Sequence, residues 1–314
     1  MSNPRISVIM NCLNSAKYLR EAIDSVYAQT YSDWEIVFWD NCSTDDSPAI
    51  AKSYDSRLRY FRGESTVPLG EARNLAIKNA QGEFIAFLDC DDIWMPEKLE
   101  LQLQEFECNV NCGLVYSDAF RVDVNLGLTG LYSEDFVPLS GNVFCELLEN
   151  NVVAPFSAII IPSRVMDMVG AFNCEYEIVE DADLILRIAE KYEIQYVSRP
   201  LVKYRFHDSN VSKKVELNVA ESLHLLDFWL ERRKDIFADH PRLKQKAQFR
   251  LYSLLIPYYI KRNQLIEAVG AFANAIKCYN FNVYYIFKDL YVLLYVRRVK
   301  RIMKELLRSF TRAW

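Results

Sequence analysis

Residues 82–92 read Gly-Glu-Phe-Ile-Ala-Phe-Leu-Asp-Cys-Asp-Asp, and this stretch decides the fold. Its apolar centre, Phe84–Leu88, has the length and composition of a strand that is buried on both faces. The strand ends in three carboxylates within four residues, Asp89, Asp91 and Asp92. Close carboxylates repel one another and the stretch holds no Lys or Arg, so we expect a divalent cation such as Mn²⁺ or Mg²⁺ beside them. The alternative is a solvated acidic turn that caps the next helix.

Strand and helix patterns alternate around this stretch. We expect strands at residues 6–10, 35–39, 58–61, 84–88 and 114–117, and a strand-like segment at 156–161. We expect helices at about residues 19–29, from the Ser47-Pro48 start with Ser47 as cap, at 70–80 with Gly82 as its end, at 96–106 and at 183–192. This order predicts an α/β fold, a mainly parallel sheet flanked by helices. Beyond residue 215 the chain reads as a C-terminal α-helical appendage rich in Leu, Tyr and Phe.

Polar side chains follow several of these strands at the point where each strand ends. Asn11 and Asn14 come after the first strand, Asp40 and Asn41 after the second, and the acidic residues after the fourth. In open α/β sheets, ligands bind at the carboxyl ends of the strands. We therefore expect these polar groups to meet at one edge of the sheet and to form the functional site.

Two further groups of polar residues lie in the second half of the chain. Asp181, in the pair Glu180-Asp181, stands at the start of a predicted helix, where an acid complements the helix dipole. The same position suits a general base. Tyr204-Arg205-Phe206-His207 follows a strand-like segment. Arg205 could pair with a phosphate and His207 could bind a metal ion, with a structural role as the alternative for a single histidine.

The motifs of this chain resemble those of glycosyltransferase family 2 in order and spacing. The resemblance is dense over about Ile6–Leu103, returns at Gly170–Arg187 and Tyr204–Ser212, and thins out in the C-terminal part. The stretches that carry it are Val8-Ile9-Met10-Asn11-Cys12-Leu13-Asn14, Asp40 before Ser43-Thr44-Asp45, Ala72-Arg73-Asn74, the stretch 82–92, and Trp94, Pro96, Lys98 and Leu99 beyond it.

The resemblance implies an inverting transferase of the GT-A type that uses a nucleotide-diphosphate sugar as donor. By this mapping Asn11 and Leu13 line the nucleotide pocket, Asp40 binds the base, and Arg73 lies near the nucleotide. Asn11 and Leu13 stand where the family commonly has a proline and an aromatic residue. The resemblance makes UDP the expected nucleotide.

The resemblance also implies a metal site and a catalytic base. Asp89 and Asp91 match the Asp-x-Asp motif that holds Mn²⁺ or Mg²⁺, and His207 matches a histidine often found beside the metal or the diphosphate. Asp181 matches the family's catalytic base, which deprotonates the acceptor hydroxyl. The Gln-x-x-Arg-Trp motif of processive synthases is absent, which favours transfer of a single sugar per encounter.

These motifs predict a domain organisation and an activity. Residues 1–212 would form the catalytic domain, with a nucleotide-binding half at 1–117 and an acceptor half at 118–212, and residues 213–314 the helical region. The expected activity is transfer of one sugar to a lipid-linked glycan or a surface-polysaccharide precursor. Direct transfer to a polyprenyl phosphate is one alternative. The other is a catalytically silent nucleotide-sugar binder that scaffolds glycan assembly.

Charge is distributed unevenly along the chain. Residues 1–200 hold 15 Lys and Arg against 32 Asp and Glu, whereas residues 201–314 hold 22 against 10. Seven cations crowd Arg297–Arg312, opposed there by Glu305, and follow the aromatic and apolar stretch Tyr284–Tyr295. This pattern predicts docking on an anionic membrane surface, with a packing helix as the alternative. The acidic body argues against nucleic acid as a partner.

The sequence gives no sign of export. Its N-terminus leads straight into Ile6–Met10, which is too short for a signal-peptide core. No stretch reaches the ~18 uncharged apolar residues that span a bilayer. The eight cysteines form no Cys-x-x-Cys pair, which favours reduced thiols over zinc ligands. We expect a cytoplasmic protein, peripheral at the inner face of the cell membrane.

Overall fold

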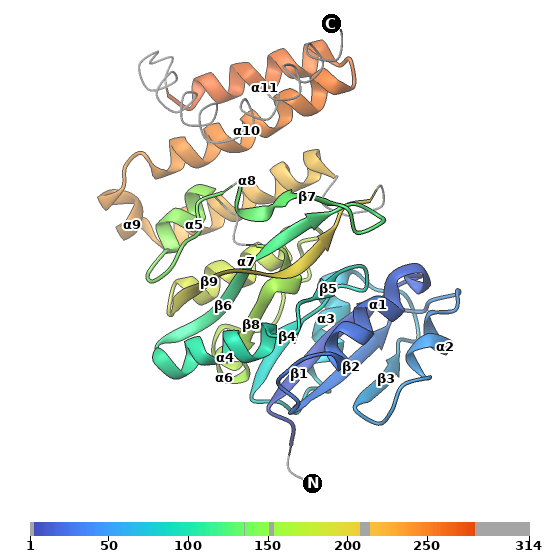
Figure 1. The fold of residues 1–314 in the computed structure, drawn as a ribbon. Helices are drawn as coiled ribbons and strands as arrows, with labels where there is room; N and C mark the ends of the chain where they lie inside the picture. Colours follow the sequence, from blue (N-terminus) through green and yellow to red (C-terminus); the bar gives the residue numbers. More distant parts are fainter. Residues whose placement is uncertain (1–2, 135, 151–153, 208–213, 280–314) are drawn as a thin grey trace, which may run out of the picture. The chain divides into compact units, whose positions relative to one another are not determined.

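The computed structural model describes residues 3–134, 136–150, 154–207 and 214–279 (Figure 1). Its packing divides the chain into two units. The first comprises Met1–Tyr132, Pro138–Phe144 and Val152–Asn210, and the second comprises Ser133–Val137, Cys145–Asn151 and Val211–Trp314. Ser133–Val137 and Cys145–Asn151 thus belong to the second unit, although the chain of the first unit runs on both sides of them.

The first unit is built on one mixed sheet. Its strands are β1 (Ile6–Cys12), β2 (Trp34–Asp40), β3 (Leu58–Arg62), β4 (Phe84–Phe87), β5 (Ile93–Trp94), β6 (Cys112–Val122), β7 (Leu128–Leu131), β8 (Ile159–Pro162) and β9 (Glu193–Arg205). They lie in the order β3-β2-β1-β4-β8-β6-β9-β5, and β7 pairs with β6. Neighbours among β1 to β4 are parallel, as are β6 and β9, while β5, β7 and β8 run antiparallel to their neighbours. The predicted α/β class with a mainly parallel sheet is confirmed.

The central strand β1 shows why polar residues meet at one edge of this sheet. Every residue of β1 except Asn11 is buried, because alternate side chains point into apolar layers on the two faces. Its register aligns Ile9 with Phe87 of β4 and Cys12 with Asp40 of β2. Since the three strands are parallel and in register, the loops that follow them leave the sheet on the same side.

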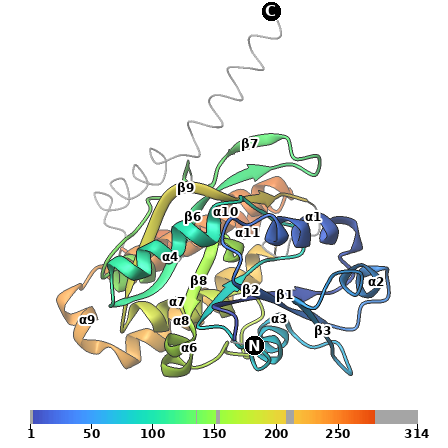
Figure 2. The same cartoon turned by 60° about the horizontal axis from the view of Figure 1, so that its bottom comes forward.

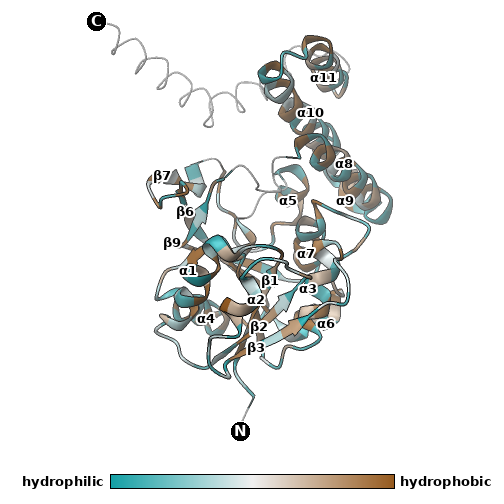
Figure 3. Ribbon diagram, turned by 90° about the vertical axis from the view of Figure 1, so that its right-hand side faces the viewer, coloured by the Kyte–Doolittle hydropathy of each residue, from teal (hydrophilic) through white to brown (hydrophobic). Residues whose placement is uncertain are grey.

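Helices cover both faces of the sheet (Figure 3). They are α1 (Ala16–Tyr27), α2 (Ser47–Ala51), α3 (Leu69–Ile77), α4 (Lys98–Cys108), α6 (Ser163–Val169) and α7 (Glu180–Ala189). Helices α1 and α4 lie on one face, and α3, α6 and α7 lie on the other. The buried side of α1 consists of Leu19, Ala22, Ile23 and Val26, which recur at helical spacing and have no exposed surface.

Gly82 and Ser47 do not have the helix-terminal roles that the sequence predicted for them. Helix α3 ends at Ile77, so Gly82 does not close it. Gly82 instead lies against β1, where a Cβ atom would stand 2.5 Å from the backbone nitrogen of Ser7. The glycine permits this close approach of two chain segments. Ser47 is the first residue of α2 rather than its cap, and its Oγ accepts a hydrogen bond from the Ser15 N–H at 3.0 Å.

Residues 112–205 complete the sheet with longer and antiparallel strands (Figure 2). The segment expected as a strand at 156–161 begins with the 3₁₀ turn η2 (Phe156–Ala158) and continues as β8. Strand β9 is 13 residues long and pairs with β6 along most of its length. The sequence had indicated only the last part of β9. Helix α4 packs across β6 and β9.

The second unit is helical, as predicted for the C-terminal appendage. It contains most of α5 (Phe144–Asn150), with α8 (Val215–Arg232), α9 (Lys234–Asp239), α10 (Leu243–Lys261) and α11 (Leu265–Lys277), and the 3₁₀ turn η1 (Tyr132–Glu134) lies where it begins. Helix α11 packs on α10 through the buried side chains of Ala268, Ala271 and Ala275. An ion pair of 3.1 Å between Lys246 and Glu149 joins α10 to α5.

Two sequence predictions concern the membrane and the thiols. Within the part of the chain that the structure describes, no helix has both the length and the apolar character needed to cross a bilayer. The predicted docking stretch, Tyr284–Arg312, lies outside the described residues. All eight cysteines are free thiols.

Candidate active site

The acidic turn, Asp89–Asp92, connects β4 to β5 at the edge of the sheet where β1 and β2 also end. The side chains of Asp89 and Asp91 are 42% and 28% exposed. Asp92, by contrast, is fully buried. The three carboxylates that look alike in the sequence therefore occupy two kinds of environment, and only two of them are open to a ligand.

Arg73 of α3 is a counter-ion of this acidic turn. Its guanidinium donates to Glu180 at 2.9 Å and lies 3.5 Å from Asp89. The guanidinium carbon also lies 4.5 Å from the ring centre of Phe156, and the side chain is buried. The sequence placed Arg73 near the nucleotide. In the structure it lies among carboxylates, where its charge favours their ionised forms.

The pair Glu180-Asp181 begins α7 and lies close to the acidic turn. Desolvation raises the pKa of Asp181, and the charge of Arg73 opposes the rise. Burial, and then the charge of Asp181, raise the pKa of Glu180 to about 7. Desolvation raises the pKa of Asp89 against the effect of Arg73, and the charges of Asp91 and Asp181 raise it further. Arg73 lies 2.9 Å from Glu180 and 3.5 Å from Asp89, so the start of α7 lies close to the acidic turn.

Asn74 explains how the chain brings α7 to this edge. Its side-chain amide donates to the carbonyl of Phe172 and accepts from the N–H of Phe172, both at 2.9 Å. This two-way pair fastens the segment before α7 to α3. The Ala72-Arg73-Asn74 motif therefore contributes in two ways, because Arg73 pairs with the acid at the start of α7 and Asn74 holds the backbone that leads to it.

His207 follows β9 and lies against the acidic turn. Its Nε2 is 2.7 Å from Oδ2 of Asp91. The imidazole stacks on the ring of Tyr18 in α1, with 5.7 Å between ring centroids. Two residues predicted as metal ligands are thus brought together from distant parts of the sequence. Tyr18 belongs to no motif, and sequence reasoning did not identify it.

The residues near the acidic turn include oxygen and nitrogen atoms of the kinds that bind a divalent cation. Across the described ranges, no group of three or more His, Cys, Asp or Glu side chains is arranged to hold a metal ion. Asp91 and His207 nevertheless place an oxygen and a nitrogen ligand side by side, and Asp89 lies in the same turn. A cation would also offset the repulsion that raises the pKa of Asp89. The donor set fits Mn²⁺ or Mg²⁺ provided that a bound diphosphate supplies further oxygens.

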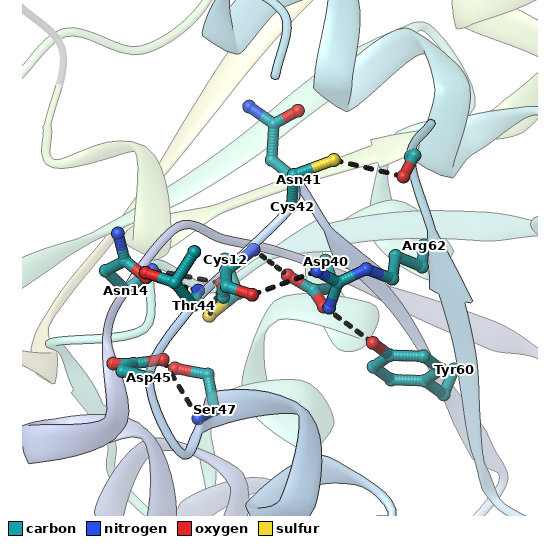
Figure 4. Close-up of polar contacts among 12 residues, drawn as sticks. Cys12, Asn14, Asp40, Asn41, Cys42, Thr44, Asp45, Ser47, Tyr60 and Arg62 are labelled. Carbon is teal, nitrogen blue, oxygen red and sulfur yellow. Dashed lines mark hydrogen bonds and ion pairs between the residues drawn. The ribbon is translucent and has the colours of Figure 1, made fainter. Parts of the chain in front are cut away.

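Asp40, at the end of β2, is enclosed by protein donors (Figure 4). Its Oδ1 accepts from the N–H of Ser43 at 2.7 Å, and its Oδ2 accepts from the Tyr60 hydroxyl at 2.6 Å and from Arg62 at 2.5 Å. The carboxylate has no exposed surface. The sequence predicted that Asp40 binds the base, and in this arrangement such a contact requires the exchange of one of these partners.

The loops after β1 and β2 hold each other in place (Figure 4). Asn14 adopts a φ of +53°, and its side-chain oxygen accepts from the N–H of Thr44 at 2.8 Å. Asp45 accepts from the N–H of Ala16, in the first turn of α1, at 2.9 Å. An acid that the sequence showed only as part of a motif therefore satisfies a free N–H at a helix start.

Asn11 and Leu13 lie at the end of β1, where the sequence predicts the pocket for the nucleotide. The side chain of Leu13 is about half exposed. The Nδ2 atom of Asn11 is buried and has no hydrogen-bond partner within the described part of the chain. A buried donor without an acceptor is costly, so this amide is a group that an acceptor atom of a ligand would satisfy.

Arg205, at the end of β9, has protein partners in place of the predicted phosphate. Its Nε donates to the carbonyl of Asp91 at 2.8 Å, its Nη1 to the carbonyl of Val124 at 3.1 Å, and its Nη2 to Glu21 at 2.5 Å. The residue is almost completely buried. The guanidinium binds the backbone of the acidic turn and its surroundings, so a contact with phosphate requires the exchange of one of these partners.

Solved structures share this arrangement of sheet and helices. Staphylococcus aureus TarS 1-349, in complex with UDP-GlcNAc, superposes with a TM-score of 0.58 and 18% identity over 85% of this chain and 90% of that one. The mannosyltransferase PcManGT from Pyrobaculum calidifontis, in complex with GDP-Man and Mn²⁺, gives a TM-score of 0.59 and 16% identity over 96% and 88%. At these identities the likeness establishes the fold alone, which is the GT-A type.

The sequence comparisons identify the family. The family model for glycosyl transferase family 2 matches residues 7–130. An uncharacterized glycosyltransferase of Methanocaldococcus jannaschii is 30% identical over 65% of this chain and 72% of its own. The Escherichia coli UDP-Glc:alpha-D-GlcNAc-diphosphoundecaprenol beta-1,3-glucosyltransferase WfgD is 29% identical over 68% of this chain and 81% of its own. The chain belongs to glycosyltransferase family 2.

Some relatives are much longer than this chain. An uncharacterized glycosyltransferase of Rickettsia felis is 32% identical over 68% of this chain, but the match covers 36% of that protein. The proportion is similar in two further Rickettsia relatives, at 34% and 35%. The chain thus spans about a third of the length of several curated relatives that it matches.

Proposed function

We propose that this protein is an inverting, metal-dependent glycosyltransferase that moves one sugar from a UDP-sugar to a lipid-linked or surface-polysaccharide acceptor. The observation that carries the proposal is the convergence of Asp89, Asp91, Asp181 and His207 at the edge where the parallel strands end. Two similar proteins support the choice of ligands: the TarS structure is a complex with UDP-GlcNAc, and WfgD is a UDP-Glc:alpha-D-GlcNAc-diphosphoundecaprenol glucosyltransferase.

In this proposal Asp181 is the general base. Its raised pKa makes it a stronger base than an exposed aspartate, while the charge of Arg73 favours its ionised form. The acceptor hydroxyl gives its proton to Asp181, and its oxygen bonds to the anomeric carbon from the face opposite the leaving group. The bond to the diphosphate oxygen breaks, and its electron pair leaves with the nucleoside diphosphate. The configuration at the anomeric carbon is thereby inverted.

Asp91 and His207 would hold the divalent cation, with Asp89 beside them. Bound there, Mn²⁺ or Mg²⁺ supplies positive charge to the departing diphosphate. The Mn²⁺ in the PcManGT complex supports this choice of ion. The cation would also reduce the repulsion between the carboxylates of the acidic turn and a bound diphosphate.

The nucleotide would lie at the ends of β1 and β2. We assign the unpartnered Nδ2 of Asn11 to an acceptor atom of the nucleotide and the exposed Leu13 to an apolar contact with it. Asp40 would reach the base by exchanging Tyr60 or Arg62 for a base N–H. Charge-assisted hydrogen bonds of this kind are stronger than neutral ones, so the exchange is selective for a base with a matching donor.

A donor panel tests this function. The full chain is incubated with UDP-, GDP- and TDP-sugars, Mn²⁺ or Mg²⁺, and a polyprenyl-diphosphate-linked sugar acceptor, and released nucleoside diphosphate is measured. We expect release from a UDP-sugar that stops when EDTA is added, and a product whose new linkage has the inverted configuration by NMR. Release that needs no metal, or a product with retained configuration, would contradict the mechanism.

The proposal includes docking of the protein on the anionic inner face of the cell membrane, where a lipid-linked acceptor would be anchored. The seven cations of 297–312 lie outside the described residues. Within the described second unit, large apolar side chains at the end of α10 and along α11 are between 47% and 86% exposed, and Lys261 and Arg262 lie beside them. The exposed set is Ile260, Leu265, Ile266, Val269 and Phe272. Apolar side chains next to cations suit the interface of an anionic bilayer.

Vesicle flotation tests the docking. The full chain and a chain that lacks Val296–Trp314 are mixed with vesicles of phosphatidylglycerol or of phosphatidylcholine alone. We expect the full chain to float with the anionic vesicles, and the shortened chain to lose most of this binding while keeping its melting temperature. Equal flotation of the two chains would contradict docking through the basic residues.

A further inference from the structure

We propose that Asp92 is a positioning residue: with Ser157 and Arg205 it forms a buried network that fixes the acidic turn against the end of β9, so that Asp91 and His207 are already side by side before a cation binds. The inference rests on the proposed function, because it concerns the metal site named there. It gives the third carboxylate of the turn a role that differs from metal binding.

The contacts of Asp92 show that it is committed to the protein. Its Oδ2 accepts a hydrogen bond from the hydroxyl of Ser157 at 2.6 Å, and its Oδ1 accepts one from the backbone N–H of Arg205 at 3.0 Å. The side chain has no exposed surface. Each carboxylate oxygen thus has a protein donor, and the donors come from two segments far from the turn in sequence. A buried carboxylate held in this way is a structural link rather than a free ligand.

Ser157 joins the two ends of the acidic turn. While its hydroxyl donates to Asp92, its Oγ accepts from the backbone N–H of Asp89 at 3.1 Å. Its carbonyl accepts from the indole N–H of Trp94 at 2.8 Å, which anchors Ser157 itself. A single buried hydroxyl therefore bridges the first and the last residue of the turn. Without it, two polar groups of the turn lose a partner in a place that is closed to water.

Arg205 joins the middle of the turn to the end of β9. Its backbone N–H binds Asp92, and its Nε donates to the carbonyl of Asp91 at 2.8 Å. Two residues further along, His207 places Nε2 at 2.7 Å from Oδ2 of Asp91. Arg205, two residues before His207, thus binds both Asp91 and its neighbour Asp92, which links the backbone segments of the two predicted ligands. This fastening sets the separation of Asp91 and His207 without any contribution from a cation.

Groups that orient metal ligands typically change metal affinity by about 10–100-fold when they are removed. Ser157→Ala removes the bridging hydroxyl and changes no ligand. Ser163 provides a matched control at the opposite end of β8, because its hydroxyl donates to the carbonyl of Gly82 at 2.6 Å, before the start of β4, whereas the acidic turn follows the end of β4. Ser163→Ala therefore removes a comparable hydrogen bond and leaves the network intact.

The test is calorimetric titration of the full chain with UDP, in Mn²⁺ and separately in EDTA, for the wild type, Ser157→Ala and Ser163→Ala. We expect Ser157→Ala to need about ten times more Mn²⁺ than the wild type to reach half of the Mn²⁺-dependent gain in UDP affinity. Its affinity in EDTA should equal that of the wild type, and Ser163→Ala should match the wild type in both conditions. Asp92→Asn, which keeps the size of the side chain, should shift the Mn²⁺ requirement in the same direction.

The outcomes separate this inference from the proposed function. If the wild type gains UDP affinity with Mn²⁺ and Ser157→Ala shows the same Mn²⁺ requirement, the network does not position the ligands and only this inference fails. Equal weakening by Ser157→Ala and Ser163→Ala, with equal losses of melting temperature, would also overturn it, because the effect would then be one of general stability. If UDP binding by the wild type is indifferent to Mn²⁺, the metal-dependent function and this inference fail together.

Discussion

The ends of β2 and β4 each deliver an aspartate to the same edge of the sheet, and their surroundings are opposite. Asp40 is buried and accepts hydrogen bonds from Ser43, Tyr60 and Arg62. Asp89 is partly exposed, lies 3.5 Å from Arg73, and has a pKa raised by desolvation and by the carboxylates around it. The end of β2 is thus balanced by the protein's own donors, whereas the end of β4 keeps an excess of negative charge. Unbalanced charge of this kind is typical of a functional site.

The largest expected effect is at Asp181, the proposed base, which lies among the carboxylates near the end of β4. Asp181→Asn removes the proton acceptor and should lower kcat by about 10²–10⁴-fold, while the affinity for the UDP-sugar changes little. Steady-state kinetics and donor titration measure the two quantities. Asp183→Asn is the control, because Asp183 lies on the same helix and pairs with Arg187 at 2.8 Å. Turnover by Asp181→Asn within a few-fold of the wild type would remove Asp181 from this role.

Burial of Glu180 beside other carboxylates predicts how stability depends on pH. Glu180 faces Arg73, Asp181 and Asp89, and its pKa is raised from 4.5 to about 7. The folded protein therefore keeps a proton that the unfolded chain has released, so this group's contribution is full below about pH 4.5 and is lost as pH rises through about 7. In urea unfolding without metal, the wild type should lose on the order of 2 kcal/mol more than Glu180→Gln between these pH values. Equal losses in the two proteins would contradict the prediction.

The two strand ends should also respond oppositely to the same substitution. Asp40→Asn replaces a buried acceptor by an amide whose N–H₂ faces donors, and should lower the free energy of unfolding by ~1–3 kcal/mol. Asp89→Asn relieves repulsion, and its stability should stay within ~1 kcal/mol of the wild type or exceed it. Chemical unfolding of both variants in EDTA measures the difference. A larger loss for Asp89→Asn than for Asp40→Asn would break the comparison.

The smallest expected effect concerns the end of β1. Asn11→Ala removes a buried N–H₂ that lacks a partner in the described structure, so it should leave the melting temperature unchanged and weaken UDP binding by ~3–10-fold, as expected for one hydrogen bond. Asn14→Ala is the contrasting variant. Because Asn14 accepts from the N–H of Thr44 at 2.8 Å, its loss should lower the melting temperature. Unchanged UDP affinity in Asn11→Ala would show that the amide of Asn11 does not contact the nucleotide.

Much of the site's location was predictable from the sequence, because the physics of parallel strands is local. Apolar runs followed by Asp40 and by Asp89 predicted strand ends that meet at one edge, and the register of β1, β2 and β4 places them there. Tyr18, Ser157 and Glu21 could not be predicted, since none of them belongs to a motif. Their roles arise from the way in which β9 and η2 approach the turn, which depends on long-range pairing.

By itself, the sequence determined the α/β fold, the edge at which the polar groups gather, and the family, since these follow from periodic apolar patterns and short motifs. Only the tertiary structure decided what each acid does. Asp89, Asp91 and Asp92 are near-identical neighbours in the chain, yet Asp92 is buried beneath donors from Ser157 and Arg205, 65 and 113 residues away. Exposure, pKa and hydrogen bonding depend on which groups lie nearby in space, and the linear order of residues does not contain that information.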